Sequence, residues 1–246
     1  MTSELPRRLQ SACLELVLVK TTDPATPDRP EGYSTWAFSG PGCEILFVGK
    51  GPKTDRAEAF RDLVADPQVR LSWPQQSHST IVLEAKEEGL CGNADALRTD
   101  LPGMALSVVT ADCVPIVIAG PNHLATIHAG WRGLAGKLLQ TTLESLPEDP
   151  DRMRAWIGPA IGACCYEVGP EVASQVVAAS GPEVEISRQP RPHLDLAAAA
   201  ALQLARAGVT KLHTVRACTR CTPDSLWSYR RDGPAAGRNW TFAWKK

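Results

Sequence analysis

The sequence predicts an α/β protein made of one domain. Strand-like and helix-like segments alternate along the chain, which argues against an all-β protein. The most apolar stretches, between residues 104 and 128, are short enough to be strands. No internal repeat and no long Pro/Ser/Gly linker divides the chain, so residues 1–246 are expected to form a single domain. A chain of this length can bury a core without disulfides.

Short apolar runs bounded by Gly, Pro or charged residues predict the strands of the first half. These strands are expected at 14–20, 33–38, 45–48, 69–73 and 81–83. Residues 55–64 have helical spacing, and Asp66-Pro67 is a signal that ends the helix. The loop between the last two of these strands carries His78.

The second half opens with three closely spaced strands, predicted at 104–109, 114–119 and 124–128. The turn Gly120-Pro121-Asn122 predicts a hairpin between the last two. Gly130 and Gly133 precede a helix expected at about 134–146. Two further helices are predicted at 170–179 and 194–207, and strands at 153–157, 211–216 and 226–229.

Composition excludes several classes of protein. The 26 basic and 27 acidic residues leave a net charge of −1, so we expect no binding to nucleic acid or to anionic membranes. No apolar run approaches the roughly 20 residues of a membrane span, and no apolar core of a signal peptide follows Arg7 and Arg8. We therefore expect a cytoplasmic protein whose eight cysteines are reduced.

Reactive side chains gather where predicted strands meet turns, in segments 75–79, 110–115 and 127–133. His78, Cys113 and His128 could close around one metal ion, and a zinc with three protein ligands keeps a fourth position open for water or substrate. A thiolate ligand favours zinc or copper over magnesium or calcium. Fifteen residues separate Cys113 from His128, which fits a strand, a tight turn and a returning strand.

The same residues allow a reaction without metal. Cys113 could be a nucleophile with His78 or His128 as its base, because a nearby imidazole holds a cysteine as thiolate. Both interpretations need a cysteine and a histidine that converge in a cleft, so the residues alone leave the choice open.

The remaining cysteines do not form a zinc motif in the sequence. Cys218 and Cys221 have the Cys-x-x-Cys spacing, but they supply half of a zinc site and no second pair lies at a suitable spacing. We interpret this pair as reduced and structural. The adjacent Cys164 and Cys165 lie in an apolar junction and are expected to be buried.

Several longer sequence motifs carry a resemblance to a known family. They are Ala94-Asp95-Ala96-Leu97 with Pro102-Gly103, Thr110-Ala111-Asp112-Cys113-Val114-Pro115, His128-Ala129-Gly130-Trp131-Arg132-Gly133, residues 157–169, and residues 228–233 with Gly237-Arg238. The chain resembles the laccase-domain or multicopper polyphenol oxidase family (YfiH-like, also called peptidoglycan editing factor). The likeness covers about residues 70–240, and residues 1–70 are less similar to the family.

This resemblance implies a compact mixed α/β sandwich and a zinc ion held by His78, Cys113 and His128, which are then also the catalytic residues. It implies a purine nucleoside phosphorylase that acts on adenosine, inosine, guanosine and methylthioadenosine and also deaminates adenosine, with nucleoside and phosphate as its partners. A metal-free Cys/His hydrolase of peptide or muropeptide amides and a weakened binding protein are the alternatives. Copper is less favoured, because multicopper oxidases need many histidines and the chain has five.

The chain departs from the family at Trp36, which stands where a pocket arginine is usual. Loss of a bidentate phosphate donor would reduce phosphorolysis more than attack by water. Arg132, at the start of a predicted helix, is the first candidate to bind phosphate. Gln76 could bind the base or the sugar. Asp112 could orient a ligand, accept a proton or form a turn, whereas Asp95 is expected to be structural.

Overall fold

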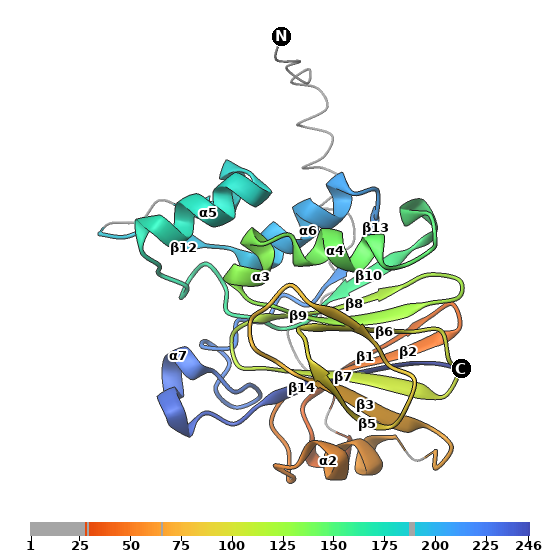
Figure 1. Cartoon of the computed structure of the whole chain (residues 1–246). Coiled ribbons are helices and arrows are strands. Elements are labelled where there is room, and N and C mark those ends of the chain that lie inside the picture. Colours follow the sequence, from red (N-terminus) through yellow and green to blue (C-terminus); the bar gives the residue numbers. More distant parts are fainter. Residues whose placement is uncertain (1–27, 29, 65, 187–189) are drawn as a thin grey trace.

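Within residues 28, 30–64, 66–186 and 190–246, which the computed structural model describes, two six-stranded sheets form the centre of the molecule (Figure 1). Apolar side chains of both sheets, among them Phe47, Val117 and Trp156, are buried together between them. This mixed α/β architecture is the fold class that the alternating pattern predicts. The strand predicted at 14–20 lies outside the described residues.

Both sheets are mixed. The first has the strand order β1 (Thr35–Gly40), β2 (Cys43–Val48), β14 (Asn239–Lys245), β7 (Met104–Thr110), β3 (Arg70–Gln75) and β5 (Gly89–Asn93). The second has the order β13 (Lys211–Thr214), β10 (Arg154–Ile157), β8 (Val114–Ala119), β9 (Leu124–Ala129), β6 (Ala96–Thr99) and β4 (Val82–Glu84). A small ladder pairs β11 (Glu185–Ile186) with β12 (His193–Leu194).

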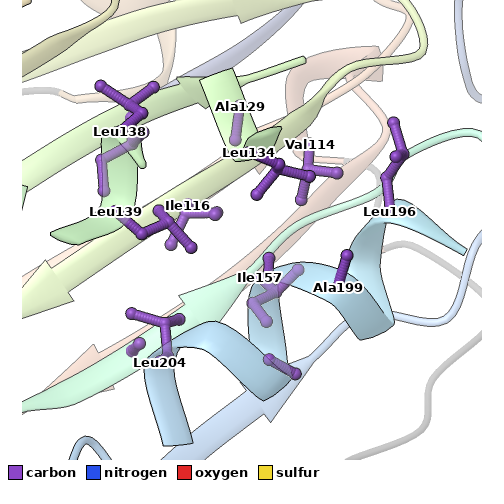
Figure 2. Packing of buried hydrophobic residues seen from close by; sticks show 14 of the residues in the cluster. Val114, Ile116, Ala129, Leu134, Leu138, Leu139, Ile157, Leu196, Ala199 and Leu204 are labelled. Atoms are coloured by element: carbon purple, nitrogen blue, oxygen red, sulfur yellow. The ribbon is translucent and has the colours of Figure 1, made fainter. Parts of the chain in front are cut away.

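Helices cover the outer faces of the two sheets (Figure 1). Those on the second sheet are α3 (Trp131–Ala135), α4 (Leu138–Glu144), α5 (Pro170–Ser180) and α6 (Leu196–Arg206). Figure 2 shows how Leu134, Leu139 and Leu204 of these helices pack with Ile116 and Ile157 of the sheet. On the first sheet, α2 (Arg56–Leu63) buries Phe60 against Phe242. The remaining helical elements of the described residues are the short α7 (Tyr229–Asp232) and four 3₁₀ turns, at Pro30–Gly32, Pro150–Arg152, Pro182–Val184 and Gly233–Ala235.

The predicted hairpin is confirmed. Strands β8 and β9 pair in antiparallel register, with Val114 opposite Ala129 and Pro115 opposite His128. The helix predicted at 55–64 is also present, and Asp55 caps it by accepting hydrogen bonds from the N–H groups of Ala57 and Glu58.

Two predictions about elements need correction, and several strands of the two sheets were not predicted. The helix expected at 134–146 begins at Trp131 and is two helices, because Lys137 takes a left-handed conformation (φ 68°) between them. The strand expected at 226–229 is an irregular segment that leads into α7, where the Ser228 hydroxyl caps the helix by accepting from the N–H of Arg231. Strand β14 was not predicted, although it lies between β2 and β7 in the first sheet.

Three connections carry the chain from the first sheet to the second. They join β3 to β4, β5 to β6 and β7 to β8. They contain His78, Asp95 and Cys113, respectively. No described helix is long and apolar enough to cross a lipid bilayer.

Candidate metal centre

The structure brings His78, Cys113 and His128 together at one point. The possible ligand atoms of the three side chains all lie within 4.8 Å of one another, and Cys113 Sγ is 3.8 Å from His78 Nε2. The two imidazole rings meet edge to face with their centroids 4.8 Å apart. His128 is buried, whereas His78 is exposed and Cys113 half-buried, so the group opens toward solvent on one side.

The β8–β9 ladder explains why Cys113 and His128 meet. Since Val114 faces Ala129 in this ladder, the preceding Cys113 lies level with the following Gly130. Gly130 leaves room for the ligands, because a Cβ atom there would lie 3.0 Å from His78 Cδ2 and 3.2 Å from Cys113 Sγ. Its backbone (φ −78°, ψ 173°) is open to any residue, so the requirement for glycine is one of space.

Gly130→Ala is therefore expected to weaken metal binding while the fold persists. The added methyl group would push His78 and Cys113 apart, and we expect affinity to fall by about 10- to 100-fold, as when the support of a ligand is lost. Competition with a chromogenic chelator measures the affinity, and thermal unfolding of the metal-free protein serves as the control. Unchanged metal affinity would contradict this account of Gly130.

Asp95 positions both histidines. Its side chain is fully buried, and Oδ1 lies 2.8 Å from His128 Nδ1 and accepts a 3.0 Å hydrogen bond from the backbone N–H of His78. Oδ2 accepts hydrogen bonds from the backbone and hydroxyl of Ser79. Because Asp95 occupies Nδ1 of His128, the Nε2 atom is left for a metal, an arrangement common among metal-bound histidines. The structural role expected for Asp95 is thus also a role in the site.

The charges within this group depend on one another. Burial by itself would raise the pKa of Cys113, but hydrogen bonds and charge from His128 and His78 outweigh it and lower the pKa to about 6. Burial would lower the pKa of His128, yet Asp95 and Cys113 raise it to about 9. Burial likewise opposes ionisation of Asp95, but the contacts with His128 and Ser79 hold its pKa well below the usual range. Without a metal, the group is thus a thiolate beside an imidazolium.

The donor set fits a transition metal with an open coordination position. Tetrahedral zinc with Zn–S near 2.3 Å and Zn–N near 2.0 Å requires a sulfur–nitrogen separation of about 3.6 Å. The 3.8 Å between Cys113 Sγ and His78 Nε2 is close to that value. One thiolate and two imidazoles suit zinc or copper and not magnesium or calcium.

A pocket of about 730 Å³ opens over the three residues. This volume is in the range of small-molecule sites. Four arginines line the pocket, and so do four aromatic side chains. The arginines are Arg56, Arg132, Arg230 and Arg238, and the aromatic residues are Trp73, Trp131, Tyr166 and Tyr229.

The two residues predicted to bind substrate both line this pocket. Arg132 is exposed, and its guanidinium lies 4.5 Å from the centroid of the Trp131 ring. Gln76 uses both ends of its amide on Val109, donating to the carbonyl and accepting from the N–H at 2.8 Å each. One N–H and one lone pair of Gln76 are left over for a substrate.

Arg56 is a pocket residue that sequence reasoning missed. It begins α2, and its Nη1 is buried without a hydrogen-bond partner among the residues that the structure describes. Burial lowers its pKa to about 10, so it stays charged at neutral pH. Trp36, by contrast, is only 2% exposed and packs in the core between the sheets. Positive charge in the pocket therefore comes from residues other than the one at position 36.

Asp112 connects the site to the C-terminal part of the chain. One carboxylate oxygen accepts from the Thr219 hydroxyl, and the other accepts from the backbone N–H of Arg230 at 2.6 Å. Asp112 has a left-handed backbone (φ 100°), which is uncommon for a residue with a side chain and is often found at functional sites. Because Cys113 follows Asp112 in the chain, these contacts hold the backbone of Arg230 close to Cys113.

The fold and the site define a mixed α/β protein with a His–Cys–His group that could hold a metal under an arginine-lined pocket. The chain belongs to the family described as multi-copper polyphenol oxidoreductase laccase, whose model matches residues 52–246.

Relatives support this assignment. A purine nucleoside phosphorylase of Deinococcus radiodurans is 39% identical over 220 residues, covering 86% of this chain and 85% of that protein. The purine nucleoside phosphorylase YfiH of Escherichia coli is 34% identical over 177 residues, covering 70% and 72%. Among solved structures, Neisseria meningitidis protein NMB0706 superposes with a TM-score of 0.75 at 28% identity, covering 87% of this chain and 99% of that one. YlmD from Geobacillus stearothermophilus gives 0.72 at 27% identity, covering 83% and 92%.

Proposed function

We propose that this protein is a zinc-dependent purine nucleoside enzyme that phosphorolyses adenosine, inosine, guanosine or methylthioadenosine and also deaminates adenosine. The observation that carries the proposal is the convergence of His78, Cys113 and His128 in the lining of a pocket that four arginines also line. The relatives are named purine nucleoside phosphorylases, and these names favour the same activity.

In this proposal His78, Cys113 and His128 hold the zinc ion. When bound, zinc would act as a Lewis acid and lower the pKa of a water molecule to about 7, which would serve deamination at neutral pH. Asp95 keeps the His128 ring in the orientation that offers Nε2 to the metal. Cys113, with its pKa near 6, is a thiolate at neutral pH and can bind a metal without first losing a proton.

Phosphorolysis needs an anion held beneath C1′ of the ribose. Phosphate oxygen forms the new bond to C1′ while the bond to the purine nitrogen breaks, and the nitrogen keeps the electron pair. Arg132 and Arg56 are the residues we assign to the phosphate, since Arg132 is exposed at the pocket and Nη1 of Arg56 has no hydrogen-bond partner within the described part of the chain. Trp131 lines the same pocket and offers an apolar face for the purine.

The decisive experiment combines elemental analysis with chromatography of the products from adenosine, with and without phosphate. We expect zinc at this site that is lost in Cys113→Ser, adenine and ribose 1-phosphate only when phosphate is present, and inosine in either case. Zinc-loaded protein that forms none of these products from adenosine, inosine or guanosine would overturn the proposal. Copper in place of zinc would contradict the choice of metal.

One observation favours the metal-free hydrolase as a second candidate function. Cys113, His128 and Asp95 form a chain of thiolate, imidazolium and carboxylate, which is the arrangement of a cysteine nucleophile and its base. The third alternative, a weakened binding protein, rests on Trp36 alone, and that residue is buried in the core between the sheets.

Alkylation with iodoacetamide separates the two functions. In metal-free protein the reaction at Cys113 is expected to rise with pH, reach half its maximum near pH 6 and stay level above, because only the thiolate reacts. Cys91 provides the comparison within the same chain, since burial raises the pKa of its thiol. Zinc should protect Cys113. Equal alkylation with and without zinc would favour the hydrolase.

A further inference from the structure

A second group of cysteines lies outside the centre formed by His78, Cys113 and His128. Cys164 and Cys165 follow strand β10, and Cys218 and Cys221 follow strand β13. The four sulfur atoms all lie within 4.8 Å of one another. Cys165 Sγ is 3.3 Å and Cys164 Sγ is 3.7 Å from Cys221 Sγ. None of the described cysteines forms a disulfide.

This arrangement corrects the expectation for these residues. Cys164 is exposed and Cys165 half-buried, although the apolar sequence around them predicts burial. The second pair that the Cys-x-x-Cys motif lacks in the sequence is therefore supplied from a loop more than fifty residues earlier.

The spacing of the sulfur atoms fits a tetrahedral zinc site. Four thiolates at a Zn–S distance near 2.3 Å have sulfur–sulfur separations of about 3.8 Å. The separations of 3.3 and 3.7 Å and the upper bound of 4.8 Å bracket this value. A disulfide would require only one pair of sulfurs to approach, whereas here each sulfur is close to the other three.

Backbone hydrogen bonds shape the loop that carries Cys218 and Cys221. The Cys218 carbonyl accepts from the N–H groups of Cys221 and Thr222, both at 3.1 Å, which closes the Cys-x-x-Cys turn. The Gly162 N–H lies 3.3 Å from Cys218 Sγ and can donate to it. Gly162 also leaves space for the sulfurs, because a Cβ there would lie 3.2 Å from Cys164 Sγ. Gly162 thus leaves room for the sulfur atoms, as Gly130 leaves room for the ligands of the His–Cys–His centre.

We propose that Cys164, Cys165, Cys218 and Cys221 bind one zinc ion in an all-thiolate tetrahedral site separate from the His–Cys–His centre. Four protein ligands leave no open position, so the ion has a structural role. It joins the loop after β10 to the loop after β13.

The place of this site in the fold gives the zinc a consequence for the pocket. Thr219, between the two ligands of the second loop, donates its hydroxyl to Asp112. Tyr166, next to Cys165, lines the pocket and lies 5.1 Å from the Arg230 guanidinium. The second ion would therefore hold one wall of the pocket in place.

Zinc counting on the reduced full-length protein tests the proposal. With zinc supplied during expression, wild type is expected to retain about two ions per chain and Cys113→Ser about one. Cys164→Ser and Cys221→Ser change exposed positions, so the fold should persist, and each should retain about one. Cys113→Ser combined with Cys221→Ser should retain none. Cys91→Ser, a half-buried cysteine outside both groups, is the matched control and should keep both.

Cobalt gives a second readout that is independent of activity. In the Cys113→Ser background, Co²⁺ is expected to give strong thiolate-to-metal absorption, and Cys221→Ser in addition should abolish it. The proposal is overturned if Cys113→Ser holds no metal, or if Cys164→Ser and Cys221→Ser keep the full zinc content. It is equally overturned if the intact protein, isolated with zinc, contains a disulfide among the four cysteines by mass. None of these outcomes depends on nucleoside turnover, so they are separable from a failure of the proposed function.

Discussion

Asp95→Ala is expected to lower metal affinity by about 10- to 100-fold and the free energy of unfolding by about 3–5 kcal/mol. The reason is that one fully buried carboxylate orients His128 and also accepts the backbone N–H of His78. Without it, the His128 ring is free to turn and several buried donors lose their partner. Competition with a chelator measures the change in metal affinity. Denaturant unfolding of the metal-free protein measures the change in stability.

The matched control for this substitution is Asp100→Ala, since Asp100 is an exposed carboxylate five positions further along the chain. Asp100→Ala should leave the free energy of metal binding and the free energy of unfolding within about 0.5 kcal/mol of wild type. In Asp95→Asn, the losses of metal affinity and of stability should lie between those of Asp95→Ala and Asp100→Ala. The amide keeps the volume and one acceptor but loses the charge that faces His128. Wild-type metal affinity in Asp95→Ala would contradict the positioning role.

Arg132→Ala is expected to reduce phosphate-dependent cleavage by about 100- to 1000-fold in kcat/KM, the usual effect of removing one donor to a developing charge. Deamination of adenosine should fall much less, because water attack needs no bound anion. Arg56→Ala should act in the same direction, since its buried Nη1 has no partner among the described residues. Initial rates at varied phosphate concentration measure the effect.

Two further variants sharpen this result. Arg132→Lys should restore only part of the activity, because an ammonium cannot form the paired hydrogen bonds of a guanidinium. Arg152→Ala, an exposed arginine outside the pocket, should behave as wild type. Equal losses of phosphorolysis and deamination in Arg132→Ala would indicate that this arginine holds the nucleoside and not the phosphate.

Local patterns predicted the parts of the fold that depend on neighbours in sequence. The β8–β9 hairpin follows from two apolar runs and a Gly-Pro-Asn turn, and with it the approach of Cys113 to His128. Strand β14 escaped prediction even though five of its seven residues are buried. It lies in the middle of a sheet between two packed layers, so its residues do not show the clean alternation of a half-exposed strand.

The residues that support the site could not be inferred from local sequence. Asp95 contacts His128 across 33 positions, and nothing near Asp95 indicates that partner. Arg56 reaches the pocket only because α2 packs on the first sheet. The cysteines at 164–165 and 218–221 meet because β10 and β13 are parallel neighbours, which brings the loops that follow them to the same end of the sheet. Such contacts depend on topology, which spacing does not reveal.

The three connections that pass from one sheet to the other give the metal centre an unusual sensitivity. Two of its ligands, His78 and Cys113, lie on these connections, and His128 lies on β9 of the second sheet, so any shift of one sheet over the other would change the distances between the ligands. A substitution that loosens the interior at Phe47 or Trp156, remote from the pocket in sequence, would then be felt as weaker metal retention. A bound ion would in turn link these connections to β9 and so help to keep the two sheets aligned.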